Sequence, residues 1–278
     1  MNFIKMHGLG NDFVIVDCFR EKITADPPEL ARQVCDRHLG VGADGLVFIW
    51  PHAEADFRMQ IINSDGSEAE MCGNAIRCMA RYAYETGLVS KTELEVETLA
   101  GRRHPELIIS DGEVKAVKVD MGEPVLDPAQ VPVQLGGDRV VNEPLALARQ
   151  LLQMTCVSMG NPHCLLFVPN VAAVPLTQIG PEVENHPLFP RKTNVEFIQV
   201  LNRNEVKMRV WERGAGETLA CGTGACATVV GCVLTGRTNQ KITVHLTLGS
   251  LEVEWAQDNH VYMTGPTTEV FRGTYAPR

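Results

Sequence analysis

Two cysteines, each followed by glycine, are the residues of this sequence best suited to chemistry. Cys72 precedes Gly73, Asn74 and a run of helix-compatible residues, which predicts that its thiol lies at the start of a helix. Backbone N–H groups at that end have no intrahelical partners and carry partial positive charge. Such a position lowers the pKa of a thiol and binds anions such as carboxylates. A single Cys-Gly pair is nevertheless more typical of a buried, inert cysteine.

A second copy of the pair changes that interpretation. Cys221-Gly222 follows Cys72-Gly73 at a spacing of 149 residues, and in the same register Thr235-Gly236 corresponds to Thr86-Gly87. A period this long indicates two related domains, because solenoid repeats are much shorter. We therefore interpret the chain as a duplication of one half.

The duplication gives the two cysteines a possible joint role. Related halves tend to pack about a pseudo-two-fold axis, so we expect the two thiols to face each other. Inverting a stereocentre requires one group to remove a proton from one side of a carbon and another group to deliver a proton to the opposite side. The cysteine pair is our hypothesis for these two groups.

The composition excludes several other classes of protein. The chain has 278 residues, of which 45% are hydrophobic and 21% charged, as expected for a globular protein with two domains. Its net charge of −9, without a basic run, argues against binding to nucleic acid. No apolar run of 18 residues occurs, and Lys5 and His7 interrupt the N-terminus, so we expect neither export nor membrane insertion.

The nine cysteines are odd in number and include no C-x-x-C pair. This pattern is typical of reduced thiols in a cytoplasmic protein, since disulfide scaffolds and zinc modules show regular spacing. We expect no metal site.

Periodicity predicts alternating strands and helices in both halves. In the first half we expect strands at 3–5, 13–17, 46–50, 56–62, 93–98, 106–109 and 113–120, and helices at 27–38 and from Cys72 to about 84. In the second half we expect strands at 154–158, 164–168, 194–200, 206–211, 242–246, 251–255 and 261–263, and helices at 142–152, near 179–186 and after Cys221.

The helix after Cys221 reads A-C-A-T-V-V-G-C-V-L and is apolar on every side, so it must be surrounded by other elements. The predicted fold class is α+β, with two pseudo-symmetric domains, each a curled, mostly antiparallel sheet wrapped around a central helix. We place the domains at 1–120 and 121–278, with the active site in the cleft between them.

Two glycine-rich motifs resemble dinucleotide-binding fingerprints but lie in the wrong context. The motif at 40–45 follows a predicted helix and opens a strand, the reverse of the required order. The motif at 222–227 has no acidic residue about 20 positions further on. We predict no cofactor.

Four segments together resemble one family. N-S-D-G-S-E-A-E-M-C-G-N-A-I-R around Cys72, E-R-G-A-G-E-T-L-A-C-G-T-G-A around Cys221, M-H-G-L-G-N-D-F and M-G-N-P-H are similar to the motifs of the diaminopimelate epimerases. The resemblance covers essentially the whole chain. It implies a cofactor-independent, cytoplasmic, homodimeric isomerase that converts LL- to meso-diaminopimelate for lysine and peptidoglycan synthesis, and a segment after Gly265 that crosses back to the first domain.

The resemblance also implies roles for individual residues. Cys72 and Cys221 would alternate as thiolate base and thiol acid, tuned by His163 and Glu212, and Arg213 would bind the distal carboxylate. Some members carry Gln at the position of Gly45, so we carry over no side-chain contact with substrate from that loop. The implied substrate-binding residues are Asn11, Asn63, Gly73, Asn74, Asn161, Asn194, Glu212, Arg213, Gly222 and Thr223.

This assignment agrees with the chemistry that the reaction requires. The α-hydrogen of an amino acid is a weak acid, and most enzymes delocalise the resulting carbanion into pyridoxal phosphate. Without that cofactor, preorganised N–H donors must stabilise the charge on the substrate carboxylate. Gly73-Asn74 and Gly222-Thr223 supply such donors.

Two alternatives stay open from the sequence. One is a racemase of the same fold acting on another amino acid, such as proline or hydroxyproline, which would not need Arg213. The other is a non-enzymatic redox or metal-binding protein that uses its thiols, against which the missing C-x-x-C pairs argue.

Overall fold

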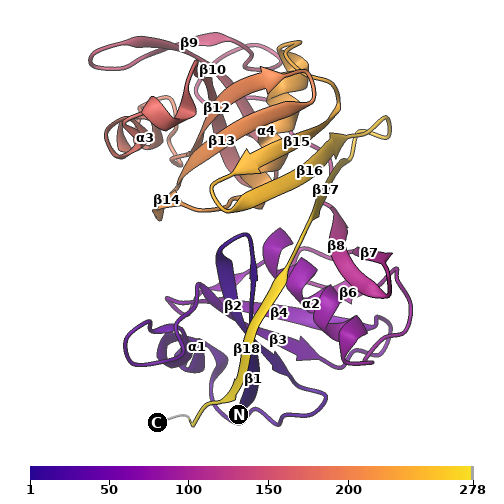
Figure 1. Ribbon diagram of the computed structural model, residues 1–278. Helices are drawn as coiled ribbons and strands as arrows, with labels where there is room; N and C mark the ends of the chain where they lie inside the picture. Colours follow the sequence, from indigo (N-terminus) through magenta and orange to yellow (C-terminus); the bar gives the residue numbers. More distant parts are fainter. Residues whose placement is uncertain (277–278) are drawn as a thin grey trace. The chain divides into compact units, whose positions relative to one another are not determined.

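The computed structural model describes residues 1–276 and divides the chain into two compact units (Figure 1). The first unit contains Met1–Asp120 and the described residues from Thr264 on, and the second contains Met121–Met263. Each unit has its own helices. None of the helices formed by residues 1–276 has the length and apolar character needed to cross a membrane.

The first unit is built on a sheet with the strand order β18-β1-β2-β3-β4-β5, to which β6 adds at β4. Most neighbours are antiparallel, whereas β2/β3 and β4/β6 are parallel. Its elements are β1 (Asn2–Gly8), β2 (Asn11–Asp17), α1 (Pro27–Cys35), β3 (Gly45–Trp50), β4 (Phe57–Asn63), β5 (Glu68–Ala69), α2 (Gly73–Glu85), β6 (Val96–Glu97), β7 (Glu106–Ser110), β8 (Glu113–Asp120) and β18 (Thr268–Thr274).

Helix α1 starts where the sequence predicts and ends earlier. Asp26 is the N-cap, with its carboxylate accepting from the Glu29 N–H at 3.4 Å. The helix ends at Cys35 rather than at 38, because Asp36 is extended and its carboxylate accepts the N–H groups of His38 and Leu39 at 2.7 and 2.8 Å. The Asp36 side chain thus forms a turn in place of a further helical turn.

The second unit contains a sheet in the order β17-β16-β15-β13-β12-β11-β10-β9, with β14 paired to β13. Two neighbouring pairs, β11/β12 and β13/β15, are parallel. Its elements are β9 (Glu143–Ala146), β10 (Leu151–Ser158), β11 (Pro162–Phe167), η1 (Val171–Ala173), α3 (Leu176–Glu184), β12 (Asn194–Asn202), β13 (Glu205–Glu212), β14 (Gly216–Thr218), α4 (Gly222–Leu234), β15 (Lys241–Leu246), β16 (Gly249–Trp255) and β17 (Val261–Gly265).

The helix expected at 142–152 is wrong. Strands β9 and β10 form an antiparallel hairpin there, pairing Glu143 with Met154 and Ala146 with Leu151. Leu145 and Met154 are fully buried, so burial on one face of this hairpin outweighs local helix propensity. Helix α3, expected near 179–186, begins at Leu176 and ends at Glu184.

Helix α4 is surrounded, as its uniform apolarity predicts. Cys226, Val229 and Val230 are fully buried, and the helix packs against β10, β11, β12 and β16 (Figure 1). Helix α2 is the central helix of the first unit and packs against β1 and β8, with Ile76 and Met79 fully buried. The predicted α+β class is confirmed, since each unit combines a mostly antiparallel sheet with a central helix.

Candidate active site

Cys72 is the N-cap residue of α2 and is half-buried. Its backbone is extended, and its carbonyl accepts the first helical N–H, from Ile76, at 3.0 Å. The side chain makes no capping hydrogen bond to the first-turn N–H groups. Instead, Cys72 Sγ lies 3.7 Å from the amide oxygen of Asn11.

Asn11 and Asn74, both predicted site residues, lie together beside Cys72. Asn74 Nδ2 donates to Asn11 Oδ1 at 2.9 Å, and Asn74 Oδ1 accepts from Arg77 Nη2 at 2.9 Å. Gly73 starts the helix, and its carbonyl accepts from Arg77 Nη1 at 3.0 Å. Arg77 is fully buried, which places a guanidinium inside the first turn of the cysteine helix.

Asn63 is the last residue of β4 in the same unit. Its Nδ2 donates to Ser67 Oγ at 3.0 Å, and its backbone N–H donates to the Ser67 carbonyl at 2.8 Å. The amide side chain therefore braces the turn between β4 and β5.

Cys221 is the N-cap of α4 and is buried, with 5% of its surface exposed. Its sulfur accepts the Gly224 N–H at 3.3 Å and lies 3.5 Å from Thr223 Oγ1. Burial raises the pKa of this thiol well above its ordinary range, and the nearby carboxylates of Glu212 and Glu196 raise it further. Burial and the two carboxylates thus outweigh the hydrogen bonds from Thr223 and Gly224, which lower the pKa of Cys221.

His163 lies on β11 and is fully buried between two oxygen atoms. Its Nδ1 is 2.7 Å from Glu196 Oε1 on β12, and its Nε2 is 2.9 Å from Asn161 Oδ1. Glu196 is also fully buried, and its Oε2 has no hydrogen-bond partner among residues 1–276. The ring of His163 is thus held rigidly at both nitrogens.

The Glu196 carboxylate reaches the start of α4. A Cβ at Gly224 would lie 2.7 Å from Glu196 Oε1 and 3.2 Å from Cys221 Sγ. Both atoms therefore approach the same Cα, which only glycine permits. The buried His163–Glu196 pair and the Cys221 thiol form one cluster.

Asn194 and Arg213 are joined through backbone groups. Asn194 Oδ1 accepts the Arg213 N–H at 2.9 Å, and its Nδ2 donates to the Pro162 carbonyl at 2.9 Å. Both ends of the Asn194 amide are therefore used inside the second unit. The Arg213 guanidinium is exposed and donates to the Arg191 carbonyl at 3.2 Å.

Glu212 ends β13 and accepts a short hydrogen bond from Thr218 Oγ1 on β14. It faces Cys221 closely enough to raise the pKa of that thiol. Gly222 and Thr223 lie in the first turn of α4, where the backbone N–H groups have no acceptor within the helix.

Three residues that contact the predicted site residues are not predicted from the sequence: Glu196, Arg77 and Asp44, whose carboxylate accepts from Asn11 Nδ2 at 2.8 Å. Glu196 lies in an apolar strand where alternation gives no sign of its histidine partner, and Arg77 resembles a surface residue of a helix. Asp44 carried a weak signal, since it aligns with Asn194 in the duplication. Within residues 1–276, no three His, Cys, Asp or Glu side chains gather as a metal site requires.

Solved structures share the fold of this chain. A probable proline racemase from Agrobacterium radiobacter has a TM-score of 0.72 at 16% identity, covering 99% of this chain and 92% of its own. A phenazine biosynthesis protein of the PhzF family from Bacillus anthracis has a TM-score of 0.70 at 16% identity, covering 99% of both chains. These similarities define the fold class.

Sequence comparison identifies the family. The model of diaminopimelate epimerase matches residues 3–126 and 155–270. A diaminopimelate epimerase from Moorella thermoacetica is 60% identical over 276 residues, covering 99% of each chain, and one from Pelotomaculum thermopropionicum is 58% identical over 279 residues, covering 100% of each. The chain belongs to the diaminopimelate epimerase family, which confirms the resemblance of its motifs.

Proposed function

We propose that this protein is an isomerase that interconverts LL- and meso-diaminopimelate without a cofactor. The observation that carries the proposal is the 60% identity to a diaminopimelate epimerase over nearly the full length of both chains. The two helix-start cysteines support it, because each unit supplies one thiol with adjoining N–H donors. This family membership favours diaminopimelate over proline, since the likeness to a proline racemase is limited to the fold.

The proposed chemistry removes a proton from one face of the α-carbon and delivers another proton to the opposite face. The thiolate of one cysteine removes the α-proton and becomes a thiol, leaving a carbanion on the substrate. The thiol of the other cysteine then delivers its proton to the opposite face and becomes a thiolate. The raised pKa of Cys221 supports its starting as the proton donor in one of the two directions.

Binding of the substrate carboxylates follows from the same residues. We assign the reacting carboxylate to the N–H groups of Gly73-Asn74 and Gly222-Thr223, where helix N-termini favour negative charge. Arg213 is the proposed partner of the distal carboxylate, because its guanidinium is exposed and offers a bidentate fork. Asn11, Asn63, Asn161 and Asn194 are the proposed polar contacts around the substrate.

His163 and Glu212 are proposed to tune the cysteines. His163 is locked by Glu196 and Asn161, and its cluster touches the Cys221 helix start through Gly224. Glu212 opposes ionisation of Cys221, which keeps a proton on this thiol.

The test is turnover of LL-diaminopimelate in heavy water with the purified chain. We expect the optical activity to fall as the meso product forms and the product to gain solvent deuterium at the inverted carbon, while recovered substrate gains little. Cys72→Ala and Cys221→Ala should each abolish epimerisation and leave the unfolding midpoint near that of the wild type. Retention of the original hydrogen in the product, or an active single mutant, would reject the two-base scheme.

We also propose a cytoplasmic homodimer. Among residues 1–276, all nine cysteines are thiols rather than halves of a disulfide, which supports a reducing compartment. Sedimentation equilibrium across protein concentrations measures the assembly, and a mass that stays at one chain contradicts the dimer.

A further inference from the structure

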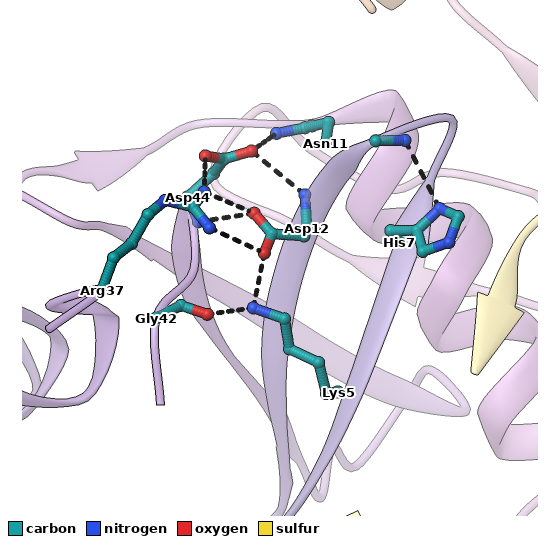
Figure 2. A network of polar contacts seen from close by, with 8 residues as sticks. Lys5, His7, Asn11, Asp12, Arg37, Gly42 and Asp44 are labelled. Atoms are coloured by element: carbon teal, nitrogen blue, oxygen red, sulfur yellow. Dashed lines mark hydrogen bonds and ion pairs between the residues drawn. The ribbon is translucent and has the colours of Figure 1, made fainter. Parts of the chain in front are cut away.

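A chain of side-chain hydrogen bonds passes directly beside Cys72. It starts at the buried guanidinium of Arg77, continues through the amides of Asn74 and Asn11, and ends at the carboxylate of Asp44 and the guanidinium of Arg37. The four bonds measure 2.9, 2.9, 2.8 and 2.7 Å in that order. Figure 2 shows its outer part, in which Asn11, Asp44 and Arg37 point toward one another.

The direction of every bond in this chain is fixed from both ends. A guanidinium only donates hydrogen bonds and an ionised carboxylate only accepts them. Arg77 therefore turns the oxygen of Asn74 toward itself, and Asp44 turns the NH2 group of Asn11 toward itself. The remaining bond runs from Asn74 Nδ2 to Asn11 Oδ1, the same oxygen that lies 3.7 Å from Cys72 Sγ.

Asp44 is itself held by charged and backbone groups. Its Oδ2 accepts from Asn11 and from the Asp12 N–H at 3.1 Å, and its Oδ1 accepts from Arg37. Arg37 also binds Asp12 through two bonds of 2.8 and 3.2 Å, and Lys5 lies 2.5 Å from Asp12 (Figure 2). Asp44 is therefore fixed in place although it is partly exposed.

We propose that Asp44 is a positioning residue for the Cys72 half of the site, which fixes the Asn11 amide with its oxygen toward the Cys72 thiol. The inference rests on the proposed function in that Cys72 transfers the proton. The Asn11 oxygen accepts the S–H of Cys72 in the protonated half of the cycle.

An amide at position 44 cannot replace this carboxylate. Asn at 44 has one oxygen for the donors of Asn11, Asp12 and Arg37, so its NH2 group must face at least one of them. If Asn11 turns to accept from that NH2 group, its own NH2 group meets Asn74 Nδ2, and two donors face each other. Asp44→Asn therefore leaves the Asn11 NH2 group to compete with two other donors for a single oxygen, while the volume of the side chain at position 44 changes little.

The experiment is a double-mutant cycle between positions 44 and 11, with two readouts. Epimerisation gives kcat and KM, and mass spectrometry of the Cys72 peptide gives its rate of alkylation by iodoacetamide, which needs no turnover. Glu85→Gln is the matched control, because it removes another Arg–carboxylate pair, that of Arg81 and Glu85 on α2.

We expect Asp44→Asn to lower kcat by about 10-fold in the wild-type background, as for loss of a hydrogen bond to a charged group. It should also change the alkylation rate of Cys72. In the Asn11→Ala background the same substitution should change each readout by less than about 2-fold, because the oriented amide is already gone. Glu85→Gln should leave both readouts unchanged.

Equal effects of Asp44→Asn in both backgrounds would overturn the inference, since they would show that Asp44 acts by its charge or on the fold. No effect in the wild-type background would also overturn it. If Asp44→Asn lowers the unfolding midpoint, Arg37→Gln tests the same series of hydrogen bonds from its outer end. Its effects on kcat and on the alkylation rate should then also depend on Asn11. Failure of the wild type to epimerise would reject the proposed function, while the alkylation cycle would still decide the role of Asp44.

Discussion

At the scale of single residues, the Cys221 thiol shows how burial competes with a helix N-terminus. The Gly224 N–H and the Thr223 hydroxyl both favour a thiolate, yet burial and the carboxylates of Glu212 and Glu196 raise the pKa of the thiol. The free protein should therefore hold this sulfur as a thiol near neutral pH. In the proposed two-base scheme, one of the two cysteines must be a proton donor at the start of each turnover.

Glu212→Gln should lower the pKa of Cys221, because the substitution removes one of the two carboxylates that oppose ionisation. At a fixed pH near 8, alkylation of Cys221 by iodoacetamide should then become several-fold faster. The pH at which the alkylation rate reaches half of its maximum should fall. Glu205→Gln is a matched control, since Glu205 lies at the opposite end of the same strand. Slower alkylation in Glu212→Gln would contradict this account.

Asp12 is held between two cations. Burial raises its pKa, but hydrogen bonds from Arg37 and Lys5, together with their charges, outweigh burial and lower it to about 2. Because this value lies below that of an unfolded chain, at about 4, the carboxylate stabilises the fold above pH 4. The contribution is lost as the pH falls from about 4 to about 2.

Asp12→Asn should lower the free energy of unfolding at pH 7 by about 1–2 kcal/mol, the Asp12 contribution reduced for solvent screening. The difference from the wild type should shrink as the pH falls toward 2. Urea unfolding followed by circular dichroism at several pH values measures it, with Asp111→Asn at an exposed turn as control. A difference that stays constant down to pH 2 would mean that the charge is not responsible.

At the scale of elements, the second unit uses glycines to bring α4 close to its sheet. A Cβ at Gly231 would lie 2.2 Å from Leu165 Cδ1 on β11, and one at Gly224 would lie 2.7 Å from Glu196 Oε1. The first contact is within the apolar core, and the second is within the cluster around Cys221. Substitution by alanine should therefore affect mainly stability at Gly231 and mainly activity at Gly224.

Gly231→Ala should destabilise the protein by about 1–3 kcal/mol through overpacking and leave activity per folded molecule nearly unchanged. Gly224→Ala should lower kcat by more than about 10-fold, because it displaces the Glu196 carboxylate beside Cys221. Urea unfolding and epimerisation assays on both variants separate the two effects. Gly136→Ala is the control, since a Cβ there meets no atom within 4 Å. Equal losses of activity in the two helix variants would contradict this distinction.

At the scale of the whole molecule, the last described strand completes the sheet that contains the first strand. β18 pairs antiparallel with β1 from Thr274 opposite Asn2 to Thr268 opposite His7. Phe271 packs edge-to-face on Phe3 with ring centroids 5.8 Å apart, and the N-terminal amine donates to the Tyr275 carbonyl at 2.9 Å. The stability of the first unit therefore depends on both ends of the chain.

A chain that ends at Gly265 should lose stability mainly in the first unit, because β1 then becomes an unpaired edge strand. Hydrogen-exchange mass spectrometry should show faster exchange across β1, β2 and α2, with β10, β11 and α4 little changed. A synthetic peptide spanning 266–276, added in trans, should restore part of the protection. Equal loss in both units, or none, would show that β18 has no selective role.

The sequence by itself determined the duplication, the two cysteine helix starts and the family. These features are encoded locally, in spacings such as that between Cys72 and Cys221 and in the apolar run after Cys221. The apolar run predicts a buried helix because no face of it can be exposed to water. The same local reasoning failed at 142–152, where pairing with a neighbouring strand outweighs helix propensity.

Only the tertiary structure decided what surrounds each thiol. Glu196 reaches His163 because β11 and β12 pair in parallel, and Asp44 reaches Asn11 because β2 and β3 do the same. Such contacts join residues more than 30 positions apart, and their energies depend on burial, which no local pattern reports. The raised pKa of Cys221 and the fixed orientation of Asn11 are therefore properties of the folded chain.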